Sequence, residues 1–252
     1  MVKGLEVFRE HFREYSDRYV LIGGAACDLA MDEVGLPFRV TKDLDIVLCV
    51  EALDEAFVRA FWDFIRSGEY EIQETATGDK RFYRFQKPKK HDYPVMLELF
   101  SREPDLLALA EESKLTPIPM GGEVSSLSAI LLDDDYYRFL RSGTKVKDGI
   151  PFVGPEHLIP LKARAWMDLT KRQEGGESVD SKDIRKHRND VFRLYGIIDP
   201  GFKADIPAAI RRDMDAFIKR MGKESIDLKQ LGLRHVGREE SLANLRRIYC
   251  PG

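Results

Sequence analysis

Two aspartates near the start of the chain have the spacing that metal chemistry requires. Asp43 and Asp45 open the apolar, β-branched segment DLDIVLCV, which predicts a largely buried strand. Side chains alternate along a strand, so both carboxylates project from one face, about 7 Å apart along the backbone, with Leu44 on the other. Neighbouring carboxylates repel each other unless a cation lies between them, and hard divalent cations such as Mg²⁺ or Mn²⁺ prefer oxygen ligands.

A pair of glycines precedes these aspartates. Gly23 and Gly24 follow a short apolar segment that predicts a strand, and they open a segment that predicts a helix. Without Cβ atoms they let a phosphate chain approach the backbone and the helix N-terminus, where N–H groups and the dipole favour anions. We predict that the polar residues before the aspartates contribute to the same nucleotide site: Arg39, Thr41 and Lys42.

A third carboxylate is expected from a neighbouring strand. The segment PVMLELF offers Glu98, a charged residue in an otherwise apolar strand. Two Asp and one Glu are the usual set for two-metal nucleotidyl transfer, in which one ion activates the hydroxyl and the other carries the triphosphate. The alternative is that Glu98 forms an ion pair with Arg81 or Arg84 on the adjacent predicted strand.

This order of strand, Gly-Gly, helix, Asp-x-Asp strand and later acidic strand resembles the polymerase-β-like nucleotidyltransferase superfamily. More narrowly, Gly-Gly with RVTKDLDIV, the lysine of LIPLKARAW and the later helix with KD and ND resemble AbiEii-type nucleotidyltransferases, the toxins of type IV toxin–antitoxin systems. The resemblance covers about residues 19–195. It implies an NTP substrate, Mg²⁺, an RNA acceptor such as the tRNA 3′ end, and a cognate antitoxin.

The sequence departs from that pattern in two places. Eighteen residues separate Gly24 from Asp43, more than in the compact form of the superfamily. In addition, Gly24 stands where many relatives have Ser, which removes a hydroxyl that would touch phosphate.

The resemblance also implies catalytic roles for two residues in the C-terminal part. Lys162 lies in a mostly apolar helix, so its ammonium is expected to reach a cleft that holds an anion, unless it is an ordinary surface lysine. On the helix that begins at Ser181, an aspartate would serve the acceptor. Spacing does not decide between Asp183 and Asp190, although the shorter separation from Lys162 favours Asp183.

Composition restricts the class of protein. A hydrophobic fraction of 43% excludes a disordered chain. No uncharged apolar run approaches the roughly 20 residues of a membrane helix, and the N-terminus lacks the apolar core of a signal peptide. The three scattered cysteines predict neither a disulfide framework nor a zinc site, which indicates a reducing cytoplasm. The motifs GxxxxGK[ST] and GxGxxG are absent, which argues against P-loop NTPases and Rossmann dehydrogenases.

Charge and element order predict an α+β protein with two domains. Residues 1–150 hold 20 Lys+Arg and 28 Asp+Glu, whereas residues 151–252 hold 20 Lys+Arg and 15 Asp+Glu. This asymmetry is explained either by a metal-binding half joined to a half that faces a polyanion, or simply by solvated helix faces. We predict a small mixed sheet with flanking helices, nucleotidyltransferase-like, in residues 1–153, and a helical domain in residues 154–252. In the last third of the first domain we expect a helix after Pro104 and strand-like pieces around 124–132 and 144–153. The triple aspartate at 133–135 is expected to cap a helix rather than to bind a second metal.

The leading hypothesis is therefore a Mg²⁺-dependent nucleotidyltransferase that moves NMP from an NTP to an acceptor hydroxyl. A transferase for a small-molecule or protein acceptor, and a catalytically silent module that binds a nucleotide or a partner, are the alternatives.

Overall fold

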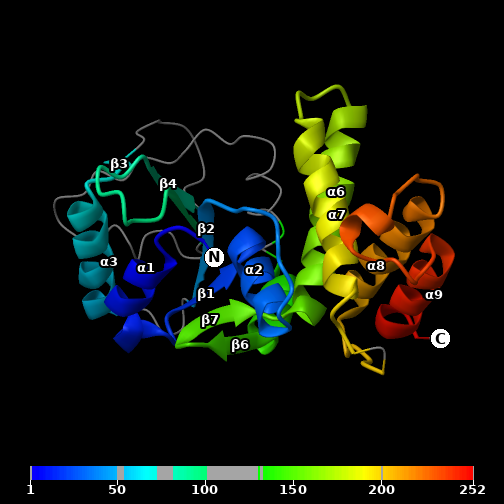
Figure 1. The fold of residues 1–252 in the computed structure, drawn as a ribbon, viewed down its shortest axis with the longest axis horizontal. Helices are drawn as coiled ribbons and strands as arrows, with labels where there is room; N and C mark the ends of the chain where they lie inside the picture. The colour runs from blue at the N-terminus through cyan, green and yellow to red at the C-terminus, as the bar shows by residue number, and fades with distance from the viewer. Residues whose placement is uncertain are drawn as a thin grey trace. The chain divides into compact units, whose positions relative to one another are not determined.

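The computed structural model describes residues 2–49, 54–72, 82–100, 130, 133–199 and 201–251 (Figure 1). These residues form two compact units. The first contains the described residues up to Phe100 together with Thr144–Val153. The second contains the described residues from Ile130 to Gly143 together with those from Gly154 onwards.

A mixed sheet forms the centre of the first unit. In the described ranges seven strands pair in the order β3-β4-β5-β2-β1-β7-β6. Their bounds are β1 (Tyr19–Ile22), β2 (Asp43–Leu48), β3 (Glu71–Ile72), β4 (Phe82–Gln86), β5 (Met96–Phe100), β6 (Thr144–Lys147) and β7 (Ile150–Val153). β2 runs antiparallel to β1 and parallel to β5, while β4 runs antiparallel to β5. The acidic strands β2 and β5 are therefore direct neighbours.

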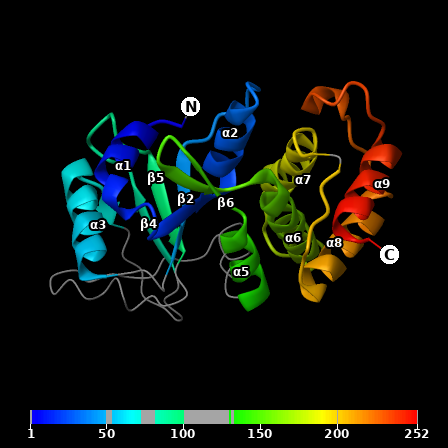
Figure 2. The ribbon, with the colours of Figure 1, turned by 90° about the horizontal axis from the view of Figure 1, so that it is seen from below.

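Helices that carry buried aromatic side chains pack beside this sheet. The helices of the unit are α1 (Leu5–His11), the 3-10 turn η1 (Arg13–Tyr15), α2 (Gly23–Glu33) and α3 (Glu55–Gly68). Figure 2 shows α1 beside α3, where the rings of Phe8 and Phe64 meet edge-on with centroids 5.6 Å apart. Asp54 begins α3 as its N-cap, because its carboxylate accepts the Phe57 N–H at 2.8 Å.

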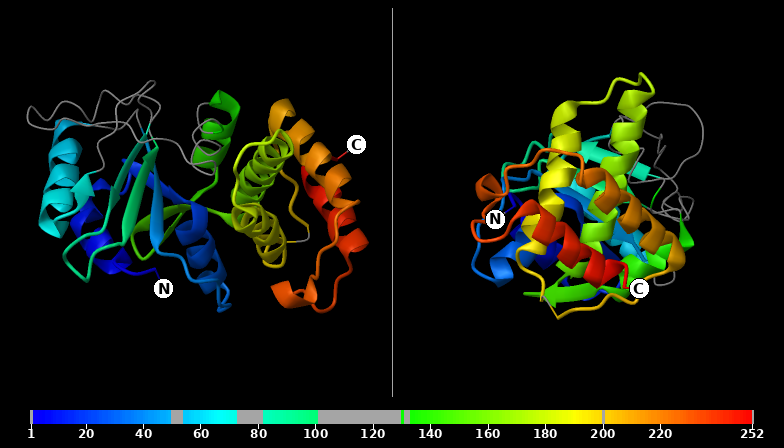
Figure 3. Two further views of the ribbon diagram at one scale, coloured as in Figure 1. Left: turned by 90° about the horizontal axis from the view of Figure 1, so that it is seen from above. Right: turned by 90° about the vertical axis from the view of Figure 1, so that its right-hand side faces the viewer.

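The second unit is helical (Figure 3). Its elements are α5 (Asp134–Ser142), α6 (Pro155–Glu174), α7 (Ser181–Tyr195), α8 (Ala208–Met221), the 3-10 turn η4 (Lys229–Leu231) and α9 (Arg238–Tyr249). Trp166 of α6 packs edge-on against Phe217 of α8, with ring centroids 5.4 Å apart. Asp133 caps α5 by accepting the N–H groups of Asp135 and Tyr136, which confirms the predicted cap.

The predicted α+β class is confirmed by this mixed sheet and by the helices that accompany and follow it. The strand expected at 144–153 is a hairpin of β6 and β7. The helix expected after Pro104, and most of the strand-like piece at 124–132, lie outside the described residues. No helix in the described ranges combines the length and apolar character needed to cross a membrane.

Candidate functional site

Both aspartates lie on β2 as their spacing predicts. Asp43 and Asp45 are partly exposed, whereas Leu44 and Ile46 between and after them are buried. Alternation along the strand places the carboxylates on one face and the apolar side chains on the other. Asp45 lies opposite Ile22, the last residue of β1, so it stands where the chain turns into α2.

The predicted third carboxylate lies beside Asp45. Glu98 aligns with Asp45 in the parallel pairing of β2 and β5, and it is 5% exposed. Burial raises the pKa of Glu98 to about 8, with further contributions from the negative charge of Asp45 and a hydrogen bond between the two carboxyl groups. The structure therefore brings these two acidic groups together, as the sequence predicted.

An arginine also contacts Glu98. Arg84 lies opposite Glu98 in the antiparallel pairing of β4 and β5. Its Nε donates to Oε1 of Glu98 at 2.8 Å, and its Nη2 contacts the same oxygen. The positive charge of the guanidinium lowers the pKa of Glu98 and so opposes the rise that burial causes. The alternative weighed for Glu98, an ion pair with a neighbouring arginine, is thus present as well.

The two glycines at the start of α2 lie very close to side chains of the predicted site. Gly23 has a φ of +65°, a left-handed conformation that favours glycine, and a Cβ on it would collide with Oδ2 of Asp45. A Cβ on Gly24 would lie 2.5 Å from Oγ1 of Thr41 and 3.6 Å from Nη2 of Arg39. The structure therefore brings Thr41 and Arg39, two of the residues predicted to bind phosphate, close to the start of α2.

The N-terminus of α2 is suited to an anion. Ile22 precedes the helix and provides no side-chain cap for its first N–H groups. The positive end of the helix dipole and those amides favour negative charge. Arg39 adds a formal positive charge close by, while Lys42 is exposed in the segment that leads into β2.

In the second unit, two predicted catalytic residues lie on α6 and α7. Nζ of Lys162 is 3.9 Å from Oδ2 of Asp190, and the two side chains are 1% and 0% exposed. Arg193 also reaches Asp190, at 3.3 Å. Asp183, which sequence separation favoured, is partly exposed near the start of α7. Asp190 is thus an ion-pair partner of Lys162, and the catalytic roles of Lys162 and Asp183 stay predictions.

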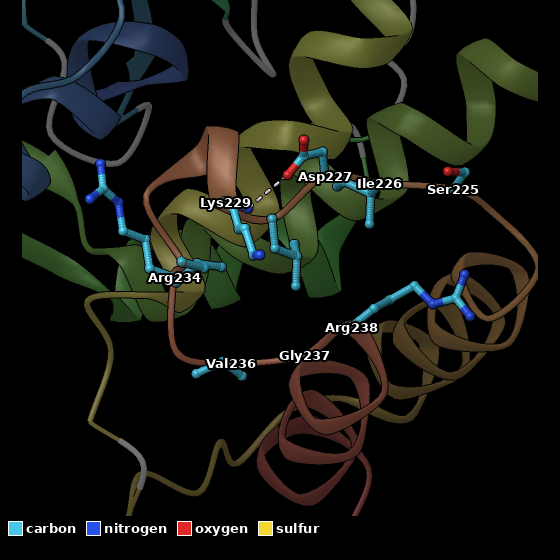
Figure 4. A pocket seen from close by; sticks show the side chains of 10 residues that line it. Ser225, Ile226, Asp227, Lys229, Arg234, Val236, Gly237 and Arg238 are labelled. Atoms are coloured by element: carbon cyan, nitrogen blue, oxygen red, sulfur yellow. Dashed lines mark hydrogen bonds between the residues drawn. The ribbon is translucent and has the colours of Figure 1, made fainter.

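The second unit also contains a cavity of ≈ 480 Å³ in the loop before α9 (Figure 4). Three cations lie in its lining, together with Asp227, whose carboxylate accepts the N–H groups of Lys229 and Gln230. These cations are Lys229, Arg234 and Arg238. None of the site residues predicted from the sequence lines this cavity.

The carboxylates fit a hard divalent cation by their chemistry. Glu98 lies beside Asp45 in a buried position where negative charge is unfavourable, as its raised pKa indicates. Oxygen donors of this type suit Mg²⁺ and Mn²⁺. However, within the described ranges no three His, Cys, Asp or Glu side chains are grouped as a metal site would need. The donor types fit, while the completed ligand set would require Asp43 to join the pair.

Arg84 was not predicted as a residue of the site. Its position in the predicted strand RFYRFQ made it one of two possible partners for Glu98. The register of β4 on β5 selects Arg84, and that register depends on a turn whose geometry the sequence does not reveal.

No protein-family model matches the chain, and no curated protein matches it significantly. Among solved structures it is similar to an antigenic nucleotidyltransferase-like protein from Paracoccidioides brasiliensis, with a TM-score of 0.44 and 17% identity over 91% of this chain and 93% of that chain. It is also similar to the Megavirus polyadenylate synthase, with a TM-score of 0.42 and 12% identity over 88% of this chain and 36% of that chain. At these scores neither likeness indicates a function for this chain. Any functional argument depends on the side chains described in this subsection.

Proposed function

We propose that this chain is a divalent-metal-dependent nucleotidyltransferase, which transfers NMP from an NTP to an acceptor hydroxyl. The contact between Gly23 and Asp45 carries the proposal, because it places a helix N-terminus directly beside a carboxylate that is paired with Glu98. An anion site next to clustered carboxylates suits a metal-bound triphosphate. Neither feature alone would be specific.

In this reaction the acceptor hydroxyl releases its proton to solvent and its oxygen bonds to the α-phosphorus. The bond from phosphorus to the bridging oxygen breaks, and pyrophosphate leaves with that electron pair. Bound by Asp43, Asp45 and Glu98, Mg²⁺ or Mn²⁺ would lower the pKa of the acceptor hydroxyl and neutralise triphosphate charge. The glycines would let the phosphates approach the backbone. The polar residues that would bind them are Arg39, Thr41 and Lys42.

The acceptor and the biological role are further parts of this proposal. The resemblance to AbiEii-type toxins favours RNA, such as the tRNA 3′ end, and a cognate antitoxin as the partner. The balance of 20 Lys+Arg over 15 Asp+Glu in residues 151–252 supports a polyanionic acceptor over a small molecule or a protein.

The test is label transfer from NTPs to total RNA in the presence of Mg²⁺. We expect transfer from α-³²P-labelled but not from γ-³²P-labelled NTP, because the terminal phosphate leaves with pyrophosphate. Asp45→Asn should abolish transfer, whereas Asp63→Asn, at an exposed ion pair with Arg66 on α3, should not. No transfer by the wild type to RNA, protein or metabolite pools, or full activity of Asp45→Asn, would refute the proposal.

A catalytically silent nucleotide-binding module is the second candidate. The observation that favours it is the hydrogen bond from Arg84 to Oε1 of Glu98, because a bound metal would need that oxygen. This candidate predicts that NTP raises the melting temperature of the protein while no label is transferred.

A further inference from the structure

The ion pair between Arg84 and Glu98 is built into the sheet. The two residues are cross-strand partners on β4 and β5, so their side chains leave the sheet on the same face. Both are largely shielded from water, with exposed side-chain fractions of 22% and 7%. Screening by solvent is therefore weak, and the charge of the guanidinium acts strongly on the carboxyl group.

The contact occupies an oxygen that the proposed metal would use. Two nitrogens of Arg84, Nε and Nη2, both contact Oε1 of Glu98. A divalent cation on that oxygen would lie next to the guanidinium, and two cations in a poorly screened site repel each other. The metal and Arg84 would therefore compete for this oxygen.

We propose that Arg84 is a positioning residue that holds Glu98 in place of the divalent cation and competes with it for the carboxylate. This inference rests on the proposed function. Cation binding requires Arg84 to leave Glu98, and the displaced guanidinium, tethered to β4, is then available to the anionic triphosphate. At Glu98, the single positive charge of Arg84 would thus be replaced by the two positive charges of the divalent cation.

A purely structural ion pair makes the opposite prediction for metal affinity. If Arg84 only ties β4 to β5, its removal should loosen Glu98 and leave cation binding unchanged or weaker. If Arg84 competes with the cation, its removal should strengthen binding even where folding becomes less stable.

The test measures Mn²⁺ binding to the full chain by the electron paramagnetic resonance of free Mn²⁺. We expect Arg84→Gln to lower the dissociation constant for Mn²⁺ about ten- to a hundredfold, the range that one charge-assisted hydrogen bond represents. The matched control is Arg66→Gln, which removes an exposed arginine paired with Asp63 on α3 and should bind Mn²⁺ as the wild type does.

A second readout uses the wild type alone. The Nε–H resonance of Arg84 should move when Mg²⁺ saturates the protein, because its bond to Glu98 breaks. Unchanged or weaker Mn²⁺ binding by Arg84→Gln, or an Nε–H signal that Mg²⁺ leaves in place, overturns the inference. If Arg84→Gln does not fold, Arg84→Lys takes its place, with a smaller gain expected.

Failure of the two proposals can be distinguished. If neither the wild type nor Arg84→Gln binds Mn²⁺, both the metal-dependent function and this inference fail. If both bind Mn²⁺ equally well and the wild type transfers label, only the role of Arg84 is wrong.

Discussion

Replacing Gly23 with alanine tests the contact at the centre of the proposed site. Gly23 has a φ of +65°, and a left-handed conformation costs a residue with a Cβ about 1–2 kcal/mol. The added methyl would also collide with the Asp45 carboxylate and lie 2.9 Å from its Cβ, so Asp45 would have to shift from its place beside Glu98. We expect Gly23→Ala to lose at least about 1–2 kcal/mol of unfolding free energy, and to lose label transfer.

Gly35→Ala separates the two effects. Gly35 has a φ of +70°, but a Cβ on it would meet nothing within 4 Å. It should therefore show the backbone cost alone, about 1–2 kcal/mol or less, and keep full transfer activity. Urea unfolding gives the stabilities, and transfer of α-³²P label gives the activities. If Gly23→Ala transfers label as fast as Gly35→Ala, the close approach of Gly23 to Asp45 does not position the site.

Three further predictions concern charged side chains. The pKa of Glu98 is raised from 4.5 to about 8, so the stability that its bound proton contributes is complete below about pH 4.5 and is lost as the pH rises towards 8. In metal-free buffer Glu98→Gln should remove this dependence of the unfolding free energy on pH, whose slope is at most about 1.4 kcal/mol per pH unit. Urea unfolding near pH 5 and near pH 8 measures it. Asp133→Ala should cost about 1 kcal/mol through loss of the α5 cap, and calorimetric Mn²⁺ titration should find binding unchanged; weakened binding would point to a second metal cluster. Lys162→Met should cost less than the ~3–5 kcal/mol of an uncompensated buried charge in urea unfolding, because Asp190 loses that partner but keeps Arg193 at 3.3 Å. Adding Asp190→Leu should restore most of the loss; a double variant that is stable and still transfers label would exclude a catalytic role for Lys162.

Local patterns account for most of what the sequence predicted. The alternation around Asp43 and Asp45 specifies a strand and its faces, and the cap at Asp133 specifies where α5 begins, because both depend on neighbours along the chain. Contacts between distant elements were harder to predict.

The ion pairs show why. Choosing Arg84 as the partner of Glu98 requires the register of one strand on another. Placing Asp190 beside Lys162 requires the rotation of α7 about its axis against α6, which spacing within α7 does not determine.

The position of the site depends on apolar residues that take no part in the chemistry. In the pairing of β2 with β5, Leu44 aligns with Leu97 and Ile46 with Leu99, and all four are buried. A slip of one residue would turn every side chain of one strand to the opposite face, so the two aliphatic side chains of that strand would leave the core. Burying a side chain of this size contributes about 1.5–3 kcal/mol, which makes the slipped register strongly unfavourable. The carboxylates between them are thereby aligned across the two strands despite their mutual repulsion. The burial of these aliphatic side chains thus holds the proposed metal ligands in register, beside the hydrogen bond between Asp45 and Glu98.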